Sequence, residues 1–151
     1  HVFGETDEQT ARKVEAARRH GLVPVLCVGE TLQERQAGRV SEVILRQLDV
    51  GLPALSAGGE RFLIAYEPVW AIGTGEEASP EIAQEVHEAL KRAARCNIKA
   101  LELRVLYGGS VNEDNVKTLM SMPDVDGVLV GGASLEALGF RRICEQVAGS
   151  V

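Results

Sequence analysis

The stretch Ala65-Tyr66-Glu67-Pro68-Val69-Trp70-Ala71-Ile72-Gly73-Thr74-Gly75 joins an expected strand to an expected helix. The strand is the apolar run at residues 61–66, and the helix begins at Ser79-Pro80, so the 11 residues 68–78 lie between Glu67 and the helix. Connections from strand to helix usually contain about 2–6 residues, and longer ones are often lids or binding loops. The first half of this connection is apolar, and glycines in its second half let the backbone approach a ligand. We therefore interpret Glu67 as a candidate general base beneath a lid that excludes water.

Helix and strand patterns alternate along the rest of the chain. A capping box at residues 6–9 starts a helix that stops at Gly21, a typical residue just past a helix end. The continuous apolar run 23–28 predicts a strand buried on both faces. The remaining expected elements are a polar loop at 31–39, a helix through Val40, Val43, Ile44 and Leu48, chain breaks at Pro53 and Gly58-Gly59, a helix from Ser79-Pro80 through Ile82, Val86 and Leu90, a strand at 103–107, a short helix capped by Asn112 through Val116 and Leu119, a strand at 125–130, and a last helix with Phe140, Ile143 and Val147 on its inner face.

This alternation predicts an α/β fold with a parallel sheet, in a single domain that spans residues 1–151. All strand-to-helix connections of such a sheet lie at one edge, and neighbouring strands are about 4.8 Å apart. If the last three strands are neighbours, Glu67, Ser110 and Gly131-Gly132 lie within roughly 10 Å of sheet width. Residues far apart in the sequence then meet at one site.

Two glycine pairs follow the last two strands. Gly108-Gly109 comes before Ser110, and Gly131-Gly132 comes after the expected strand 125–130. Unobstructed backbone N–H groups at such positions bind anions, although glycines also make tight turns between strand and helix. Two pairs on successive strands, together with Gly73 in the lid, favour an anion site. Barrel folds place phosphate sites after their last two strands, which fits this position.

Charge and hydropathy limit the classes of partner. The net charge is −6, with 16 Lys and Arg against 22 Asp and Glu, and there is no long basic run. This argues against nucleic acid and anionic membranes as partners. No apolar run approaches the roughly 20 residues that span a bilayer. His1, His20 and His87 do not share a spacing typical of metal ligands, so each is expected at the surface or at a helix end and no metal is expected.

The cysteines and the N-terminus indicate a cellular setting. Cys27, Cys96 and Cys144 are odd in number and contain no Cys-x-x-Cys pair, which fits a reducing cytosol, with Cys27 a small buried residue. We therefore expect a cytoplasmic location. The sequence begins at His1 without an initiator methionine and without signal-peptide features, which suggests that the chain begins inside a longer protein.

Three of these loops together resemble the signature loops of triosephosphate isomerase. They are residues 66–75, 107–111 and 128–133, in the family's order and spacing, and residues 3–5 and 27–30 match as well. The resemblance covers essentially the whole chain. It implies the (β/α)8 TIM-barrel fold, of which this chain would hold the C-terminal four βα units with a leading helix. It also implies isomerisation of dihydroxyacetone phosphate and D-glyceraldehyde 3-phosphate through an enediolate, a reaction of glycolysis and gluconeogenesis, without a cofactor and, in the full-length family, by a homodimer.

Residue by residue, the resemblance implies roles within the site. Glu67 resembles the general base that moves a proton between C1 and C2 of a triose phosphate. Tyr107 resembles the residue whose hydroxyl fastens the closed lid. Glu30 and Asn112 are expected to be structural rather than catalytic. The backbone amides of Gly73, Ser110, Gly131 and Gly132 resemble the phosphate donors, Pro68, Val69 and Trp70 the first hinge of the lid, and Ala71, Ile72, Gly73, Thr74 and Gly75 the flap that closes over substrate.

The resemblance also shows what these 151 residues lack. A (β/α)8 barrel usually needs about 250 residues. The family's Asn-x-Lys segment and its electrophilic His have no counterpart here, since His1 is not the equivalent of that His. Glu76-Glu77 occupies the second hinge of the lid, where the family commonly has a Lys. Without the electrophile and the ammonium group a developing enediolate lacks electrostatic stabilisation, so we expect this chain alone to have very little isomerase activity.

Two other interpretations of the sequence stay open. The first is a non-catalytic, phosphate-binding half-barrel that assembles with itself or with a partner. The second is another phosphate-binding barrel, such as those of tryptophan or thiamin synthesis. That class shares the double-glycine loops but gives no reason for the lid that contains Trp70.

Overall fold

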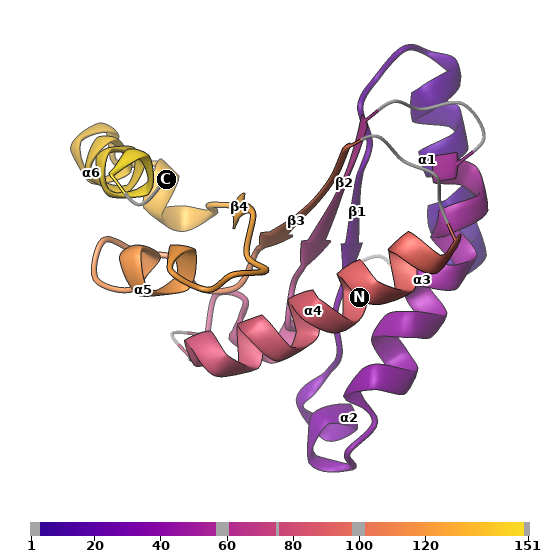
Figure 1. Ribbon diagram of the computed structural model, residues 1–151, viewed down its shortest axis with the longest axis horizontal. Coiled ribbons are helices and arrows are strands. Elements are labelled where there is room, and N and C mark those ends of the chain that lie inside the picture. Colours follow the sequence, from indigo (N-terminus) through magenta and orange to yellow (C-terminus); the bar gives the residue numbers. More distant parts are fainter. Residues whose placement is uncertain (1–3, 57–60, 75, 98–101, 150–151) are drawn as a thin grey trace.

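A four-stranded parallel sheet forms the centre of the computed structural model, which describes residues 4–56, 61–74, 76–97 and 102–149 (Figure 1). The strands lie in the order β1-β2-β3-β4, so the last three are neighbours, which is the condition under which their loops were expected to meet. The strands are β1 (Val25–Val28), β2 (Arg61–Tyr66), β3 (Glu102–Tyr107) and β4 (Gly127–Val128). The helices are α1 (Asp7–Arg19), α2 (Leu32–Gln36), α3 (Val40–Ser56), α4 (Pro80–Asn97), α5 (Val116–Met120) and α6 (Ala137–Ala148), with 3-10 turns η1 (Val69–Ala71) and η2 (Gly132–Ser134).

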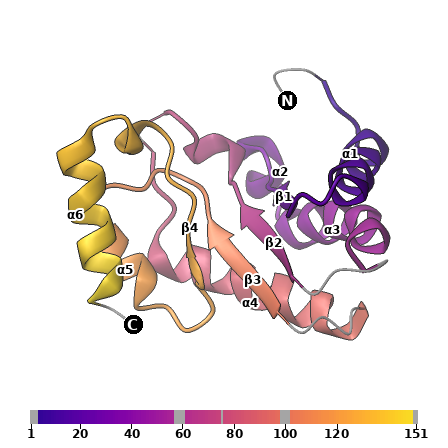
Figure 2. The same ribbon diagram turned by 90° about the horizontal axis from the view of Figure 1, so that it is seen from above.

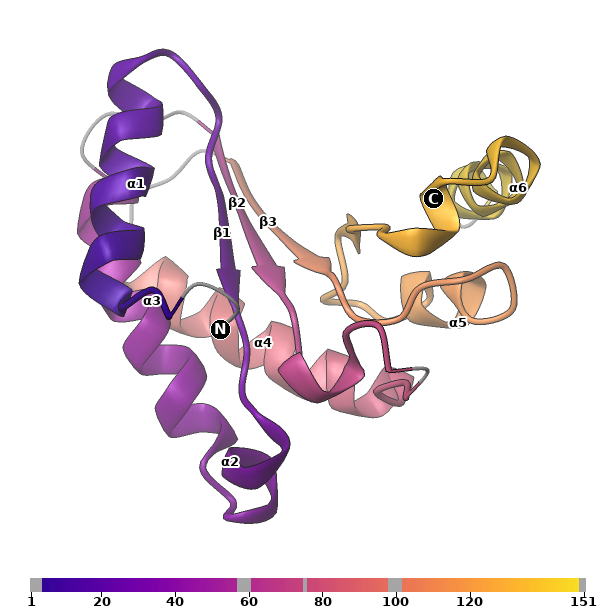
Figure 3. The same cartoon turned by 180° about the vertical axis from the view of Figure 1, so that it is seen from behind.

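Helices α3 and α4 pack along one face of the sheet, whereas α1 and α6 lie at its two ends (Figure 2). Seen from behind, α1 and α3 lie together beside β1, and α5 and α6 lie together beside β4 (Figure 3). The core between the sheet and the helices contains Leu26, Ile64, Leu48 and Leu90, all buried. None of the described helices is long and apolar enough to cross a membrane.

The prediction that the first strand is buried on both faces is wrong. Burial alternates along β1, with Leu26 and Val28 buried but Val25 40% exposed. Val23 lies before the strand and is 55% exposed, and Cys27 is also exposed rather than a small buried residue. The reason is that α3 covers only one face of β1, and no described helix covers the other.

The fourth strand is shorter than the expected strand 125–130. Only two of its residues pair with β3, Gly127 with Leu106 and Val128 with Tyr107. A further hydrogen bond, from the amide of Leu129 to the carbonyl of Tyr107 at 2.8 Å, continues the ladder by one residue. Among the described strands β4 has a neighbour on one side only, as does β1, so its backbone has ladder partners on that side alone.

Local capping signals predict the helix starts well. Thr6 and Gln9 form the expected capping box of α1, and Gly21 follows with a positive φ of 73°. The hydroxyl of Ser79 accepts a hydrogen bond from the amide of Ile82 at the start of α4. The expected polar loop at 31–39 instead contains helix α2. The sequence did hold a sign of this helix, a second capping box formed by Thr31 and Glu34.

Three expectations about the helices are wrong. Pro53 does not break the chain: it lies inside α3, where burial of Leu48 and Leu52 on the core face outweighs one lost backbone hydrogen bond. Asn112 does not cap α5, because its side chain instead forms a turn before the helix by accepting from the amide of Asn115, the residue at the N-cap. Phe140 is 39% exposed and therefore does not lie on the inner face of α6.

Three side chains of α4 fasten this helix to the turn that leads into β4. Gln84 exchanges two hydrogen bonds with Asp124, at 2.6 and 3.0 Å. The Nδ1 atom of His87 lies 3.3 Å from the backbone carbonyl oxygen of Asp124, and Lys91 pairs with Asp126 at 2.9 Å. His87 is thus buried within α4, not at the surface or a helix end as expected. The contacts fix the position of α4 relative to β4.

The burial of His87 predicts that acid destabilises the fold. Burial lowers the pKa of His87 from its ordinary value of 6.5 to about 4. The unfolded chain therefore binds more protons between these values, so the free energy of unfolding decreases as the pH falls from 6.5 towards 4, by on the order of 2 kcal/mol at pH 5. Urea unfolding at pH 7 and pH 5, on the complete polypeptide that contains this chain, checks this. The variant His87→Gln cannot titrate and should lose less stability between the two pH values; equal losses would contradict the prediction.

Candidate active site

The carboxylate of Glu67 stands at the end of β2, where the ends of three neighbouring strands meet. The amide of Glu67 donates to the carbonyl of Val28 at 2.8 Å, next to β1. On the other side the amide of Gly108 donates to the carbonyl of Tyr66, also at 2.8 Å. The backbone that carries Glu67 is therefore held from both sides by the sheet.

Glycines leave the room that the Glu67 side chain occupies. A Cβ atom on Gly108 would lie 2.7 Å from the Cγ atom and 3.1 Å from the Oε1 atom of Glu67. Any larger residue would push the carboxylate away from this position. The first of the two glycines after β3 is thus required by packing against Glu67, which is a role beyond the anion binding that the sequence suggested.

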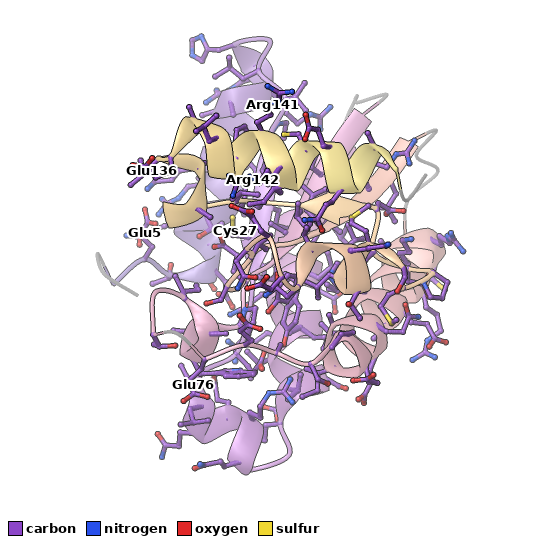
Figure 4. The ribbon with its side chains drawn as sticks, turned by 90° about the vertical axis from the view of Figure 1, so that its left-hand side faces the viewer. Glu5, Cys27, Glu76, Glu136, Arg141 and Arg142 are labelled. Atoms are coloured by element: carbon purple, nitrogen blue, oxygen red, sulfur yellow. The ribbon has the colours of Figure 1, made fainter. Side chains whose placement is uncertain are left out.

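The surroundings of Glu67 raise its basicity. The side chain is half-buried, and burial raises the pKa of its carboxyl group, although a hydrogen bond from the Cys27 thiol partly opposes this. Although the Cys27 residue as a whole is exposed, partial desolvation of its thiol and the nearby Glu67 carboxylate raise the thiol pKa to about 12, so the thiol stays protonated and remains a donor. In the view of Figure 4 Cys27 lies just below Arg142 and to the right of Glu5, with Glu76 well below all three. A carboxylate with a raised pKa near a solvent-accessible face suits a general base.

A buried carboxylate anchors the first hinge of the predicted lid. Glu30 is completely buried, and its Oε1 atom accepts from Nε1 of Trp70 at 2.8 Å and from Nε of Arg35 at 2.8 Å. The hydroxyl of Tyr66 donates to the same oxygen at 3.2 Å. The Arg35 guanidinium also lies over the Trp70 ring, 5.2 Å from its centre. Glu30 is therefore structural, as the sequence suggests, and acts on the hinge directly.

The loop after β3 contacts the lid at two points. The amide of Ala78, at the second hinge, donates to the hydroxyl of Tyr107 at 3.4 Å. The hydroxyl of Ser110 donates to the carbonyl of Ala71 at 2.8 Å. The lid is thus attached to β3 on one side and, through Trp70, to Glu30 on the other.

The flap is exposed at its middle three residues, whereas Ala71 at its start is buried. Ile72, Gly73 and Thr74 are all exposed, and the backbone of Gly73 is in the left-handed region with φ 66°. The Thr74 hydroxyl donates to the carbonyl of Trp70 at 2.8 Å and so closes a turn. Gly75, the last residue of the expected flap, lies outside the described residues.

The second glycine pair lies at the same edge of the sheet. Gly131 and Gly132 follow β4, are exposed, and have open space where a Cβ atom would stand. Gly132 begins the turn η2. The structure thus brings Glu67, Ser110 and this pair to neighbouring strand ends. In the described part of the chain no three His, Cys, Asp or Glu side chains are grouped as metal ligands would be.

Two contributors to this region were missed in the sequence. Arg35 lies near the end of the short helix α2. The capping box that begins this helix was visible in the sequence and indicated a helix that would carry Arg35. His87 lies on the apolar face of α4 between the buried Ala83 and Leu90, at helical spacing from both, which indicated burial. Phe3, which matches the family in the sequence, lies outside the described residues.

Comparisons with known proteins agree with the geometry. A family model described as Triosephosphate isomerase matches residues 1–147. The chain is 51% identical over 144 residues to the triosephosphate isomerase of Herminiimonas arsenicoxydans, which covers 93% of this chain and 58% of that protein. It is 53% identical over 152 residues to that of Pseudomonas aeruginosa (99% of this chain, 60% of the relative) and 47% identical over 153 residues to that of Chlamydia muridarum (99% and 56%). The chain thus spans little more than half the length of these relatives.

The anchoring of Trp70 predicts a large effect of removing Glu30. Glu30→Ala should lower the free energy of unfolding by about 3 kcal/mol, because it leaves the partly buried Arg35 without its counter-charge. Glu30→Gln should cost about 1 kcal/mol, because the amide oxygen still accepts from Trp70. Urea unfolding of the complete polypeptide measures both. The control is Glu42→Ala, which removes an exposed partner of Arg39 and should change stability little. If Glu30→Ala and Glu42→Ala lowered the free energy of unfolding equally, the anchoring role of Glu30 would be ruled out.

Proposed function

Because the chain belongs to the triosephosphate isomerase family, we propose that the protein containing it interconverts dihydroxyacetone phosphate and D-glyceraldehyde 3-phosphate. The observation that carries this proposal is the setting of Glu67. It is a half-buried carboxylate with a raised pKa, held at the end of a central strand beneath a long loop. The raised basicity suits abstraction of a proton from carbon.

In the proposed mechanism Glu67 removes a proton from C1 of dihydroxyacetone phosphate. The C1–H electron pair becomes the double bond of an enediolate, and the negative charge develops on the carbonyl oxygen. Glu67 then returns a proton to C2, which gives the aldehyde after the hydroxyl proton has moved between the two oxygens. The half-buried setting makes this carboxylate a stronger base than one in water, and Cys27 limits its orientation by a hydrogen bond.

The phosphate of the substrate binds at the neighbouring loops in this proposal. The backbone amides of Gly73, Ser110, Gly131 and Gly132 would hold its oxygens. Support comes from the position of these residues at the same edge of the sheet and from the open space at the second glycine pair. Backbone amides need no basic side chain to bind an anion, which is compatible with the net charge of −6.

The lid serves to exclude water from the enediolate. Pro68, Val69 and Trp70 act as the first hinge, Ala71 to Gly75 as the flap, and the hydroxyl of Tyr107 as the fastening of the second hinge. The contact between Tyr107 and Ala78 and the anchoring of Trp70 support this assignment. Exclusion of water strengthens electrostatic interactions within the site and protects the reactive intermediate. We further propose a cytoplasmic homodimer as the working form.

Shortening the base tests its assignment. In the complete polypeptide, Glu67→Asp should lower kcat by roughly 100-fold and leave KM nearly unchanged, because a displacement of about 1 Å affects the chemical step rather than binding. A coupled assay with D-glyceraldehyde 3-phosphate measures both constants. The same change at an exposed position far from the site, Glu42→Asp, should alter neither. An unchanged kcat in Glu67→Asp would remove Glu67 from the reaction.

Crowding the base tests its geometry. Gly108→Ala places a methyl group against the Glu67 side chain and should lower kcat about tenfold or more while the protein still folds. The control is Gly149→Ala, whose new Cβ atom would meet only the carbonyl oxygens of Glu145 and Gln146, at ordinary contact distances of 3.6 and 3.8 Å. The two variants should differ in kcat. Equal values would show that the position of Glu67 seen here is not the reactive one.

A further inference from the structure

We propose that His87 is a positioning residue of the lid, which holds the Tyr107 ring so that its hydroxyl meets the amide of Ala78. This inference rests on the proposed function, because it assigns a part to a lid over the Glu67 site. The inference extends the proposed function by assigning a role to a residue of α4, which packs on a face of the sheet and does not contact substrate.

The hydrogen bonds of His87 define its state. Its side chain is fully buried, and its Nδ1 atom lies 3.3 Å from the backbone carbonyl oxygen of Asp124. A carbonyl oxygen only accepts, so Nδ1 carries the ring proton and Nε2 is left with a lone pair. Nε2 has no hydrogen-bond partner in the described part of the chain. A buried polar atom without a partner costs about 1–3 kcal/mol, which an apolar residue at this position would avoid.

The ring of His87 contacts two tyrosines, and this gives a reason for its presence. Its centre lies 6.4 Å from that of Tyr107, with an angle of 36° between the planes, and 6.0 Å from that of Tyr66, at 85°. The two tyrosine rings are themselves 6.2 Å apart. The three rings therefore form a closed group, in which moving one displaces the others, since packed interiors have little free space.

Each tyrosine of this group holds one end of the lid. The hydroxyl of Tyr66 donates to Glu30, the carboxylate that accepts from Trp70 at the first hinge. The hydroxyl of Tyr107 accepts from the amide of Ala78 at the second hinge. His87 thus contacts one residue that binds the lid, Tyr107, and one that supports the anchor of its first hinge, Tyr66, although it is not itself part of the lid.

The contact at the second hinge is sensitive to small displacements. The distance of 3.4 Å between the Ala78 amide and the Tyr107 hydroxyl is at the long end for a hydrogen bond. A shift of the ring by a few tenths of an ångström away from Ala78 would break it. His87 resists such a shift because its buried ring packs against both tyrosine rings, where little free space remains.

Two variants separate the ring of His87 from its hydrogen bond. His87→Phe keeps an aromatic ring against the tyrosines but loses the donor to Asp124. His87→Gln keeps an N–H donor but loses the ring. In the complete polypeptide we expect His87→Gln to lower kcat about fivefold, the effect of one lost hydrogen bond, and His87→Phe to retain kcat within about twofold. The opposite order would overturn the proposal, because it would show that His87 only ties α4 to the turn before β4.

A double-mutant cycle with Tyr107→Phe tests whether His87 acts through Tyr107. Tyr107→Phe removes only the hydroxyl that meets Ala78. If His87 acts by holding that hydroxyl, His87→Gln should lower kcat less than about twofold further once Tyr107→Phe is present. Independent, additive effects on kcat would contradict the proposal. A merely structural role of His87 would lower Tm and leave the two effects additive.

Hydrogen exchange at Ala78 gives a readout that does not depend on isomerase activity. His87→Gln and Tyr107→Phe should each make exchange of the Ala78 amide at least about fivefold faster, and the double variant should be no faster than Tyr107→Phe alone. His87→Phe should leave this exchange close to that of the unaltered protein. If the protein lacked isomerase activity but exchange followed this pattern, the proposed function would fail and the positioning of Tyr107 would stand. Unchanged exchange in His87→Gln would overturn the inference, whatever the activity.

Discussion

The structure depends on the parallel pairing of β2 with a strand on each side. This pairing continues past the end of β2, where the amide of Glu67 reaches the carbonyl of Val28 and the amide of Gly108 reaches the carbonyl of Tyr66. Parallel strands end at one edge of the sheet, so strand pairing by itself brings the loops that follow the strands to this edge. The position of Glu67 is thus a property of the sheet, and the glycine at 108 lets its side chain stay there.

The lid combines firm attachment with an exposed flap. Its first hinge is anchored by the buried Glu30, and its second is joined to β3 through the hydroxyl of Tyr107. Between them Ile72, Gly73 and Thr74 contact solvent, whereas Ala71 is buried. Attachments that rest on a few polar contacts can be broken and remade at small cost, whereas the three rings beneath them stay packed. In the proposed function this division lets the loop move over the Glu67 site while the proposed base stays in place.

The sequence predicts burial correctly for one face of an element and wrongly for the other face of the same element. Leu26 and Val28 are buried as the apolar run suggests, but Val25 and Cys27 are exposed, because a strand pattern does not say which of its faces will be covered. At the other end of the sheet Leu135, which follows η2, is 85% exposed. Which face of an element is covered depends on the packing of the other elements, and the element's own pattern does not contain this information.

The sequence by itself determined the order of the elements, the starts of α1 and α4, the parallel sheet and the family, because capping, apolar periodicity and loop motifs act over a few neighbouring residues. It also placed Glu67 at a strand end. Only the tertiary structure decided that Cys27 meets Glu67, that Glu30 binds Trp70, that β4 stops after two residues and that His87 lies buried against two tyrosines. The residue pairs in these contacts are 20 to 40 positions apart in the sequence. The free energy of the contacts comes from burial and pairing that exist only once the strands and α4 have come together.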